Sequence, residues 1–441
     1  MDEDPDRDSA LRALVVAYPF PPVGGAGVAR MAKLVKYLPG LGVQTAVLTV
    51  SNPSVPLLDH SREGDLPEGV EVVRVRTLEP GYAMKAAAWK EQASATVGLW
   101  GRGKRALSGA ARQLLVPDPQ ILWQPAAQAA LAGRLLRRRD DVVLISGPPF
   151  SQFLLAPLCH LGGAALVLDY RDEWSTYRTT YEMMGKGAAV VGERLEAFLV
   201  GRADVITAAT EAFRENLLAR FPSLDPARVI TIPNGYDSED VCAELPPLPR
   251  DRFVITYAGT LFKLTSPVGL LGAIARLHAA EPELARLLDV RFYGRVVDTE
   301  AAAFAGSEAL GVRRLGYLPH DEVKAVLAAS HLDLVLLAYV PGSERVYPAK
   351  AFELMAIGRP TLTLAPPGAL SELVTRHRLG ALLRPGDEAG IAAFLADALR
   401  AFRDGRYPES ATAVDIERYH RRALAGEFAQ ALRLAVATRR G

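Results

Sequence analysis

The stretch from Ala13 to Val50, ALVVAYPFPPVGGAGVARMAKLVKYLPGLGVQTAVLTV, contains a complete strand–helix–strand pattern. An apolar, β-branched run is followed by the Gly-rich loop PPVGGAG, an amphipathic helical segment and a second apolar run. A crossover through a helix joins parallel strands, so this unit predicts a parallel sheet covered by helices. Gly24 and Gly25 would let the main chain approach a ligand at the helix N-terminus, although any tight turn also uses such a pair.

The same alternation continues along most of the chain and is interrupted once. Turn residues at 233–237 and the proline-rich stretch 244–251 mark a linker. We therefore expect two Rossmann-like α/β domains, residues 1–236 and 237–414, with the C-terminal helix 415–441 packed back on the first domain. Their parallel sheets would face a central cleft, because ligands of such folds bind at the carboxyl ends of the strands.

The composition excludes several classes of protein. The 441 residues include 51 Lys and Arg against 50 Asp and Glu, a balance that argues against a nucleic-acid partner. Cys159 and Cys242 have no metal-ligand spacing and indicate reduced thiols in a cytoplasmic protein. The acidic N-terminus lacks the pattern of a signal peptide. Asp-x-Asp occurs only in the N-terminal residues 2–8 and in no loop that follows a predicted strand, so we predict neither a metal nor a cofactor.

Residues 81–116 differ from the rest, with two tryptophans and several cationic residues. One interpretation is a helix with a solvated basic face. The other is an amphipathic surface that contacts anionic lipid, which would make the protein peripheral to a membrane.

Residues 347–360, YPAKAFELMAIGRP, predict a short helix that begins near Pro348 and ends at Gly358. Lys350 lies in its first turn, where the helix dipole disfavours a cation. A bound anion, such as a diphosphate, that contacts both the helix N-terminus and Lys350 would explain a lysine at this position. Glu353 lies one turn further and suits two vicinal hydroxyls, as on a ribose. The alternative is a surface ion pair between Lys350 and Glu353, which would contribute little.

A second group of charges follows the apolar strand at 165–170. Arg171 and Asp172 emerge at its carboxyl end and hence at the expected cleft. Arg171 would bind phosphate, and Asp172 would orient it or accept a proton from an acceptor hydroxyl. The alternative is an Arg171–Asp172 ion pair that fixes the loop.

Residues 347–360 resemble the donor-site motif of retaining nucleotide-sugar glycosyltransferases of family 4, which have the GT-B fold. Residues 17–27 resemble the Gly-rich loop of that family, 234–237 resemble the turn that opens its linker, and 257–260 resemble the first strand of its second domain. The resemblance implies transfer of a sugar from a nucleotide-diphosphate sugar to an acceptor hydroxyl, with retention and without metal. It also implies that Glu353 holds the ribose.

Two positions depart from the family pattern. The second glutamate of the usual pair is replaced by Arg345, with Glu344 beside it, so either Glu344 meets the donor sugar or Arg345 binds phosphate. Where the family often has an arginine, this chain has Thr260. Lys263 and Arg295 would then neutralise the phosphates. The catalytic residues predicted in this way are Arg171, Asp172 and Glu344.

Two other functions fit the same architecture, a nucleotide-sugar 2-epimerase and a non-catalytic partner that binds a nucleotide sugar. The sequence names neither the base, nor the sugar, nor the acceptor.

Overall fold

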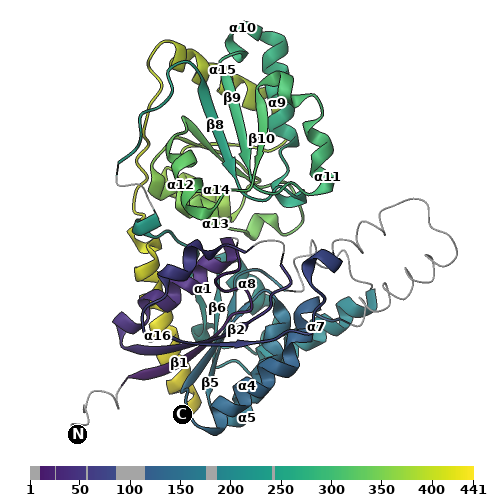
Figure 1. The fold of residues 1–441 in the computed structure, drawn as a ribbon, viewed down its shortest axis with the longest axis vertical. Coiled ribbons are helices and arrows are strands. Elements are labelled where there is room, and N and C mark those ends of the chain that lie inside the picture. Colours follow the sequence, from purple (N-terminus) through teal and green to yellow (C-terminus); the bar gives the residue numbers. More distant parts are fainter. Residues whose placement is uncertain (1–9, 25, 56–57, 86–114, 175–185, 241–243) are drawn as a thin grey trace, which may run out of the picture. The chain divides into compact units, whose positions relative to one another are not determined.

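The computed structural model describes residues 10–24, 26–55, 58–85, 115–174, 186–240 and 244–441. The chain forms two compact units, residues 1–233 with 421–441 and residues 234–420. We describe each unit by itself (Figure 1). The expected cleft between them stays a prediction.

The N-terminal unit is built on a seven-stranded parallel sheet in the order β3-β2-β1-β4-β5-β6-β7. Leu11 of β1 pairs with Val43 of β2, which sets the register of the first unit of the sequence. Inward-facing residues such as Val15, Val47, Leu144 and Val167 are fully buried. The strands are β1 (Leu11–Val16), β2 (Val43–Val50), β3 (Glu71–Val75), β4 (Val142–Gly147), β5 (Ala165–Tyr170), β6 (Val205–Ala208) and β7 (Val229–Thr231).

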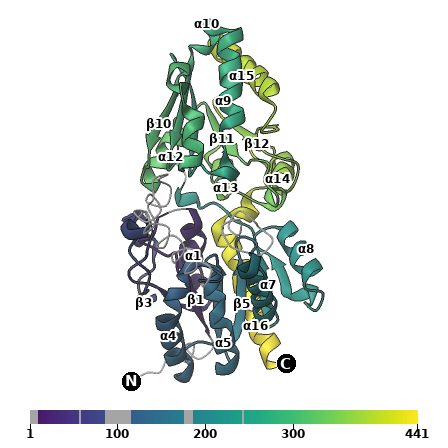
Figure 2. The same ribbon diagram turned by 90° about the vertical axis from the view of Figure 1, so that its right-hand side faces the viewer.

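Helices cover this sheet, and one of them comes from the far end of the chain. The C-terminal helix, drawn in yellow, runs along the N-terminal sheet (Figures 1 and 2), where its apolar residues Leu424, Phe428 and Leu432 join the core. The helices of the unit include α1 (Ala26–Tyr37), α4 (Gln124–Leu136), α5 (Ala156–Gly162), α7 (Lys186–Val200), α8 (Glu211–Arg220) and α16 (Arg421–Arg440).

The last helix is shorter than predicted. It begins at Arg421 and not at Asp415, because Asp415 adopts a left-handed backbone with φ 54° and a 3-10 turn follows at Glu417–Tyr419. Tyr419 packs on the C-terminal unit, 5.1 Å from the Phe352 ring, and its hydroxyl lies 3.0 Å from His377. Residues 415–420 therefore belong to the C-terminal unit.

The C-terminal unit has a six-stranded parallel sheet in the order β10-β9-β8-β11-β12-β13. Its strands are β8 (Phe253–Ala258), β9 (Leu288–Tyr293), β10 (Val312–Gly316), β11 (Leu332–Leu336), β12 (Thr361–Leu364) and β13 (Ala381–Leu383). Its helices are α9 (Val268–Ala280), α10 (Pro282–Ala285), α11 (Asp298–Ala301), α12 (His320–Ala328), α13 (Ala349–Ile357), α14 (Ala369–His377) and α15 (Glu388–Arg403). Two α/β units with parallel sheets confirm the predicted fold class.

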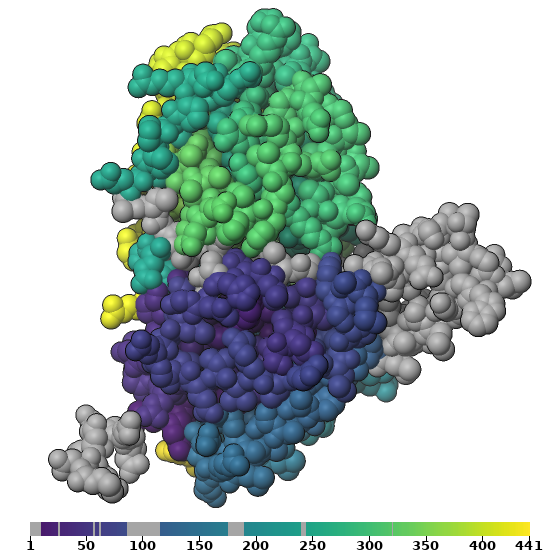
Figure 3. Space-filling view, in the orientation of Figure 1, coloured from purple at the N-terminus to yellow at the C-terminus, as the bar shows by residue number. Residues whose placement is uncertain are grey.

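The strand order of each sheet reverses once. In the N-terminal unit the chain runs outward from β1 to β3 and then returns to place β4 on the other side of β1. In the C-terminal unit the reversal lies between β8 and β11. The loops that follow such neighbouring strands diverge and leave a crevice, which is where doubly wound folds bind ligands. Figure 3 shows one face of the molecule, on which the early residues (purple to blue) cover the N-terminal unit and green residues the C-terminal unit.

Candidate functional site

Helix α13 begins at the carboxyl end of β11, beside the point where the second sheet reverses. Pro348 is its N-cap residue, and Gly358 ends it in a left-handed conformation with φ 77°. These are the helix limits predicted from the sequence. Phe352 and Met355 are buried and hold the helix on the core, so its first turn has a fixed position at the edge of the sheet.

Lys350 extends from this first turn over an aromatic ring. Its Nζ lies 3.5 Å from the ring centroid of Tyr257, a fully buried residue near the end of β8. The Nζ atom is itself buried and has no hydrogen-bond partner among the described residues. Burial lowers the pKa of Lys350 to about 7, although the negative charge of Glu353 acts in the opposite direction. An ammonium that lacks an acceptor here is poised to receive an anion.

The surface pair considered as an alternative does not form, since Lys350 and Glu353 make no ion pair in the described structure. Glu353 is half-buried, one turn further along α13. Its predicted contact with a ribose stays a prediction.

Gly259 makes room for the lysine. Its φ is 148°, and a Cβ atom at this position would lie 2.6 Å from Lys350 Nζ. Its N–H donates to the carbonyl of Tyr293 at 2.8 Å, which fixes the loop that follows β8. A side chain at residue 259 would therefore both strain the backbone and displace the ammonium.

Lys263 and Arg295 lie in the loops that follow β8 and β9, and both are exposed. The N–H of Leu261 donates to the carbonyl of Arg295 at 2.8 Å, which joins the two loops. The structure thus brings both cations to the same edge of the sheet as Lys350. Their contact with one ligand stays a prediction.

Glu344 and Arg345, the two candidates for the altered glutamate position, lie in one 3-10 turn, Ser343–Arg345. They pair with each other at 2.5 Å, and Glu344 also accepts from the Gly342 N–H at 3.0 Å. Gly368, at the start of α14, packs against this turn, because a Cβ atom there would lie 2.2 Å from the Glu344 carbonyl. The pair lies near the N-termini of α13 and α14. Its geometry fits both predictions, contact of Glu344 with the donor sugar and contact of Arg345 with phosphate.

In the N-terminal unit, Arg171 contacts main chain. Its guanidinium donates to the carbonyls of Gly27, in the first turn of α1, and of Gly147 and Pro148, at the carboxyl end of β4. The Arg171–Asp172 ion pair that was considered as the alternative is absent from the described residues. Arg171 therefore ties two loops together through carbonyls, and in these contacts it is a positioning residue; a phosphate contact stays a prediction.

Asp172 is half-buried, and burial raises its pKa while the charge of Arg171 opposes the rise. Gly24 is half-buried two residues before the start of α1, in the position expected of the Gly-rich loop. Gly25 lies outside the described residues.

The sequence did not reveal a buried network in this unit. Arg30 of α1 pairs with Asp169 of β5 at 2.8 Å and donates to the Ile232 and Pro233 carbonyls, at 2.7 Å each. Ser146 and Thr207 donate to the same carboxylate, at 2.7 and 2.8 Å. Burial alone would raise the pKa of Asp169, but the charge of Arg30 and these bonds hold it below its ordinary value. The sequence feature that could have revealed this network is Asp169 within an apolar strand, because a buried aspartate requires a partner.

No group of three His, Cys, Asp or Glu side chains in the described part of the chain is arranged to hold a metal ion. Within the same residues, no helix combines the length and the apolar character needed to span a bilayer. Most of the segment 81–116, for which a membrane contact was considered, lies outside the described residues.

Comparisons with known proteins agree with the resemblance found in the sequence. Residues 24–235 match a family model described as a glycosyl transferase 4-like domain. D-inositol 3-phosphate glycosyltransferase 2 of Catenulispora acidiphila is 31% identical over 229 residues, which are 47% of this chain and 53% of that protein. The D-inositol 3-phosphate glycosyltransferase of Geodermatophilus obscurus is 29% identical over 246 residues, 51% of this chain and 54% of that one. The match thus spans about half the length of these relatives.

Solved structures match over nearly the whole chain. Sucrose-phosphate synthase from Thermosynechococcus elongatus superposes with a TM-score of 0.63 at 14% identity, covering 97% of this chain and 99% of that one. Anabaena HepE, solved with UDP and glucose, has a TM-score of 0.60 at 13% identity, covering 96% and 99%. At such identities the likeness concerns the fold, and it confirms the predicted GT-B architecture.

Proposed function

We propose, from the match of residues 24–235 to a glycosyl transferase 4-like domain, that the chain transfers a sugar from a nucleotide-diphosphate sugar to an acceptor hydroxyl. The proposal includes retention of the anomeric configuration, which rests on the resemblance of residues 347–360 to the donor motif. It requires no metal and no cofactor besides the donor substrate, and it assigns the reaction to the cytoplasm.

Lys350 is the observation that carries this proposal. Its ammonium is buried over the Tyr257 ring without an acceptor in the described part of the chain, and it lies in the first turn of α13, where the helix dipole also attracts an anion. A diphosphate would provide the missing acceptors. With a pKa of about 7, the lysine is only partly protonated at neutral pH, and a bound anion would raise its pKa and keep it charged.

In the transfer, the bond between the anomeric carbon and the diphosphate oxygen breaks, and negative charge develops on the leaving group. Lys350 and the free N–H groups at the start of α13 would stabilise that charge, with Lys263 and Arg295 at the same edge of the sheet. Cations and a helix N-terminus can neutralise a diphosphate in this way, which is why the proposal includes no metal. Glu353 would accept hydrogen bonds from the ribose.

Similar folds bind donors of this class. The Anabaena HepE structures contain UDP with glucose or UDP-glucose, and an Escherichia coli structure contains UDP-2-fluoro glucose. These ligands belong to those proteins, and they make UDP-sugars the first donors to test here.

The test is incubation with UDP-, GDP-, ADP- and dTDP-sugars, followed by measurement of released nucleotide. We expect slow release from one donor, and loss of that release in Lys350→Met. Lys324→Met is the matched control, because Lys324 pairs with Asp321 on α12 and lies outside the predicted site. Donor binding without turnover in the presence of candidate acceptors would favour a non-catalytic partner, and change of the donor sugar itself would favour a 2-epimerase.

A further inference from the structure

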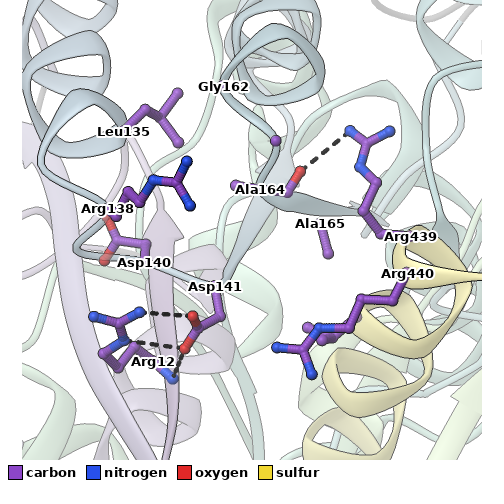
Figure 4. Close-up of a pocket in the computed structure, with 12 residues that line it drawn as sticks. Arg12, Leu135, Arg138, Asp140, Asp141, Gly162, Ala164, Ala165, Arg439 and Arg440 are labelled. Atoms are coloured by element: carbon purple, nitrogen blue, oxygen red, sulfur yellow. Dashed lines mark hydrogen bonds and ion pairs between the residues drawn. The ribbon is translucent and has the colours of Figure 1, made fainter.

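The N-terminal unit has a cavity of about 290 Å³ at the amino edge of its sheet. It lies where β1, β4 and β5 begin and where α4, α5 and α16 end, at the opposite edge from the loops that carry Gly24 and Arg171 (Figure 4). The proposed transferase reaction makes no use of this cavity.

Positive charge dominates the cavity, which four arginines and two aspartates line. Both carboxylates are already neutralised. The Arg12 guanidinium donates two hydrogen bonds to Asp141, at 2.7 and 3.1 Å. Arg134, which does not line the cavity, donates two to Asp140, at 2.7 and 2.8 Å.

Of the remaining three arginines, Arg439 has several partners, among them Asp204, whose carboxylate lies 3.6 Å from the Arg439 Nε atom. Arg439 donates to the Ala164 carbonyl at 3.2 Å, and its other terminal nitrogen lies 2.8 Å from His160. Neither Arg138 nor Arg440 forms a side-chain hydrogen bond or ion pair with a described residue, and neither carries a dashed line in Figure 4. Two guanidinium groups are therefore available to a ligand.

The ordinary explanation for arginines here is the end of three helices, where cations offset the negative end of the helix dipole. Arg439 fits this explanation, because it bonds a carbonyl that follows α5. Arg440 lies in the last turn of α16 and also fits it by charge, but neither Arg440 nor Arg138 bonds a terminal carbonyl among the described residues, so both guanidinium groups stay open to a ligand. If the arginines served only to offset the helix dipoles, the cavity would have no affinity for an anion. A binding measurement can therefore distinguish this explanation from a ligand site.

We propose that this cavity binds a phosphate group. Guanidinium groups match phosphate oxygens in geometry and charge, and two of them on different elements would hold one group from two sides. The volume lies at the lower limit of ligand pockets, roughly 300–1,000 Å³, and suits a phosphate with a small attached group.

The phosphate could come from a soluble ester or from a lipid head group, and two exposed leucines that neighbour lining residues in the sequence bear on this choice. Leu136 and Leu161, which adjoin lining residues of α4 and α5, are 86% and 83% exposed. Apolar side chains beside a phosphate site are what an interfacial contact with lipid would use.

The test measures binding of inorganic phosphate by calorimetry, and binding of vesicles made of phosphatidylcholine with and without phosphatidic acid. Arg138→Glu should lower the affinity for the phosphate source about tenfold or more, because a hydrogen bond between charged groups is replaced by repulsion. Arg137→Glu is the matched control, since it makes the same charge change one residue earlier, outside the lining. Nucleotide release from the donor should be the same in both variants.

Leu136→Ser with Leu161→Ser separates the two sources. Loss of vesicle binding with retained binding of inorganic phosphate identifies a lipid head group, and retention of both identifies a soluble ester. The proposal is overturned if neither probe binds the wild type, or if Arg138→Glu and Arg137→Glu change the affinity equally. Neither result would touch the proposed transferase activity.

Discussion

Replacement of Lys350 by methionine should stabilise the protein and abolish donor binding. Most substitutions at a buried position destabilise, so an increase in stability is a sharp expectation. It follows from an ammonium that is buried without an acceptor among the residues that the structure describes, a cost that the proposed ligand would explain. Methionine has nearly the same shape and keeps the contact with the Tyr257 ring.

The magnitude follows from the environment of the lysine. Burial lowers its pKa from 10.5 to about 7. At about 1.4 kcal/mol for each pKa unit, this opposes folding by about 4 kcal/mol at pH 7. The pKa of about 7 expresses the net cost of the ammonium in its place 3.5 Å from the Tyr257 ring, so no separate attraction is subtracted. The variant should therefore be more stable by about 4 kcal/mol, or about 8–16 °C in Tm for a unit of this size.

The sign of the pH dependence is a second check on this result. In the unfolded chain the lysine keeps its proton up to about pH 10.5, while in the folded chain it loses it near pH 7. The cost of burial is therefore complete below pH 7 and declines as the pH rises toward 10.5. The advantage of Lys350→Met should shrink accordingly between pH 7 and pH 9.

The assay is thermal unfolding of the wild type, Lys350→Met and Lys324→Met at pH 7 and pH 9, with calorimetric titration of the best donor at pH 7. Lys324→Met should change both quantities far less, because the ammonium of Lys324 already has Asp321 as its partner. The reasoning is refuted if Lys350→Met lowers Tm, or if it binds the donor as tightly as the wild type.

Three further predictions concern the same two units. Donor affinity should fall about tenfold between pH 6 and pH 8, because Lys350 loses its proton near pH 7 while the diphosphate of a nucleotide sugar keeps its charge. Calorimetry in buffers of different ionisation enthalpy should detect proton uptake on binding. An affinity that does not change with pH would contradict the role of Lys350. Glu353→Ala should weaken nucleotide binding about tenfold, or about 1.4 kcal/mol. A 2′,3′-dideoxy nucleotide, which lacks the ribose hydroxyls, should bind the variant and the wild type equally. Unchanged affinity of the variant for the normal nucleotide would remove Glu353 from the site. Arg30→Met should lower the free energy of unfolding, measured by urea denaturation, by about 3–5 kcal/mol, because it leaves the Asp169 carboxylate buried without its cation. The double variant with Asp169→Leu should recover part of that loss. A loss below about 1 kcal/mol in the single variant would show that the network contributes little to stability.

Local patterns in the sequence were sufficient for the fold class and for the limits of α13. Strands and helices alternate with turn residues between them, and both signals act over a few residues. Gly358 ends α13 because its left-handed backbone suits glycine, a property visible in the sequence alone. The start of α16 was missed, because the left-handed Asp415 carries no comparable signal.

The environment of each charged residue required the tertiary structure. The sequence by itself determined that Lys350 stands in a helical first turn, and that Asp169 lies within an apolar strand. Only the order of the strands placed β11 beside β8, and so brought Lys350 over Tyr257 and removed its ammonium from water. Only the folded sheet brought Arg30 to Asp169 and carried the Arg171 guanidinium to main-chain carbonyls. The physical reason is range: backbone preferences act between near neighbours in the chain, whereas burial and charge pairing depend on residues that the fold alone brings together.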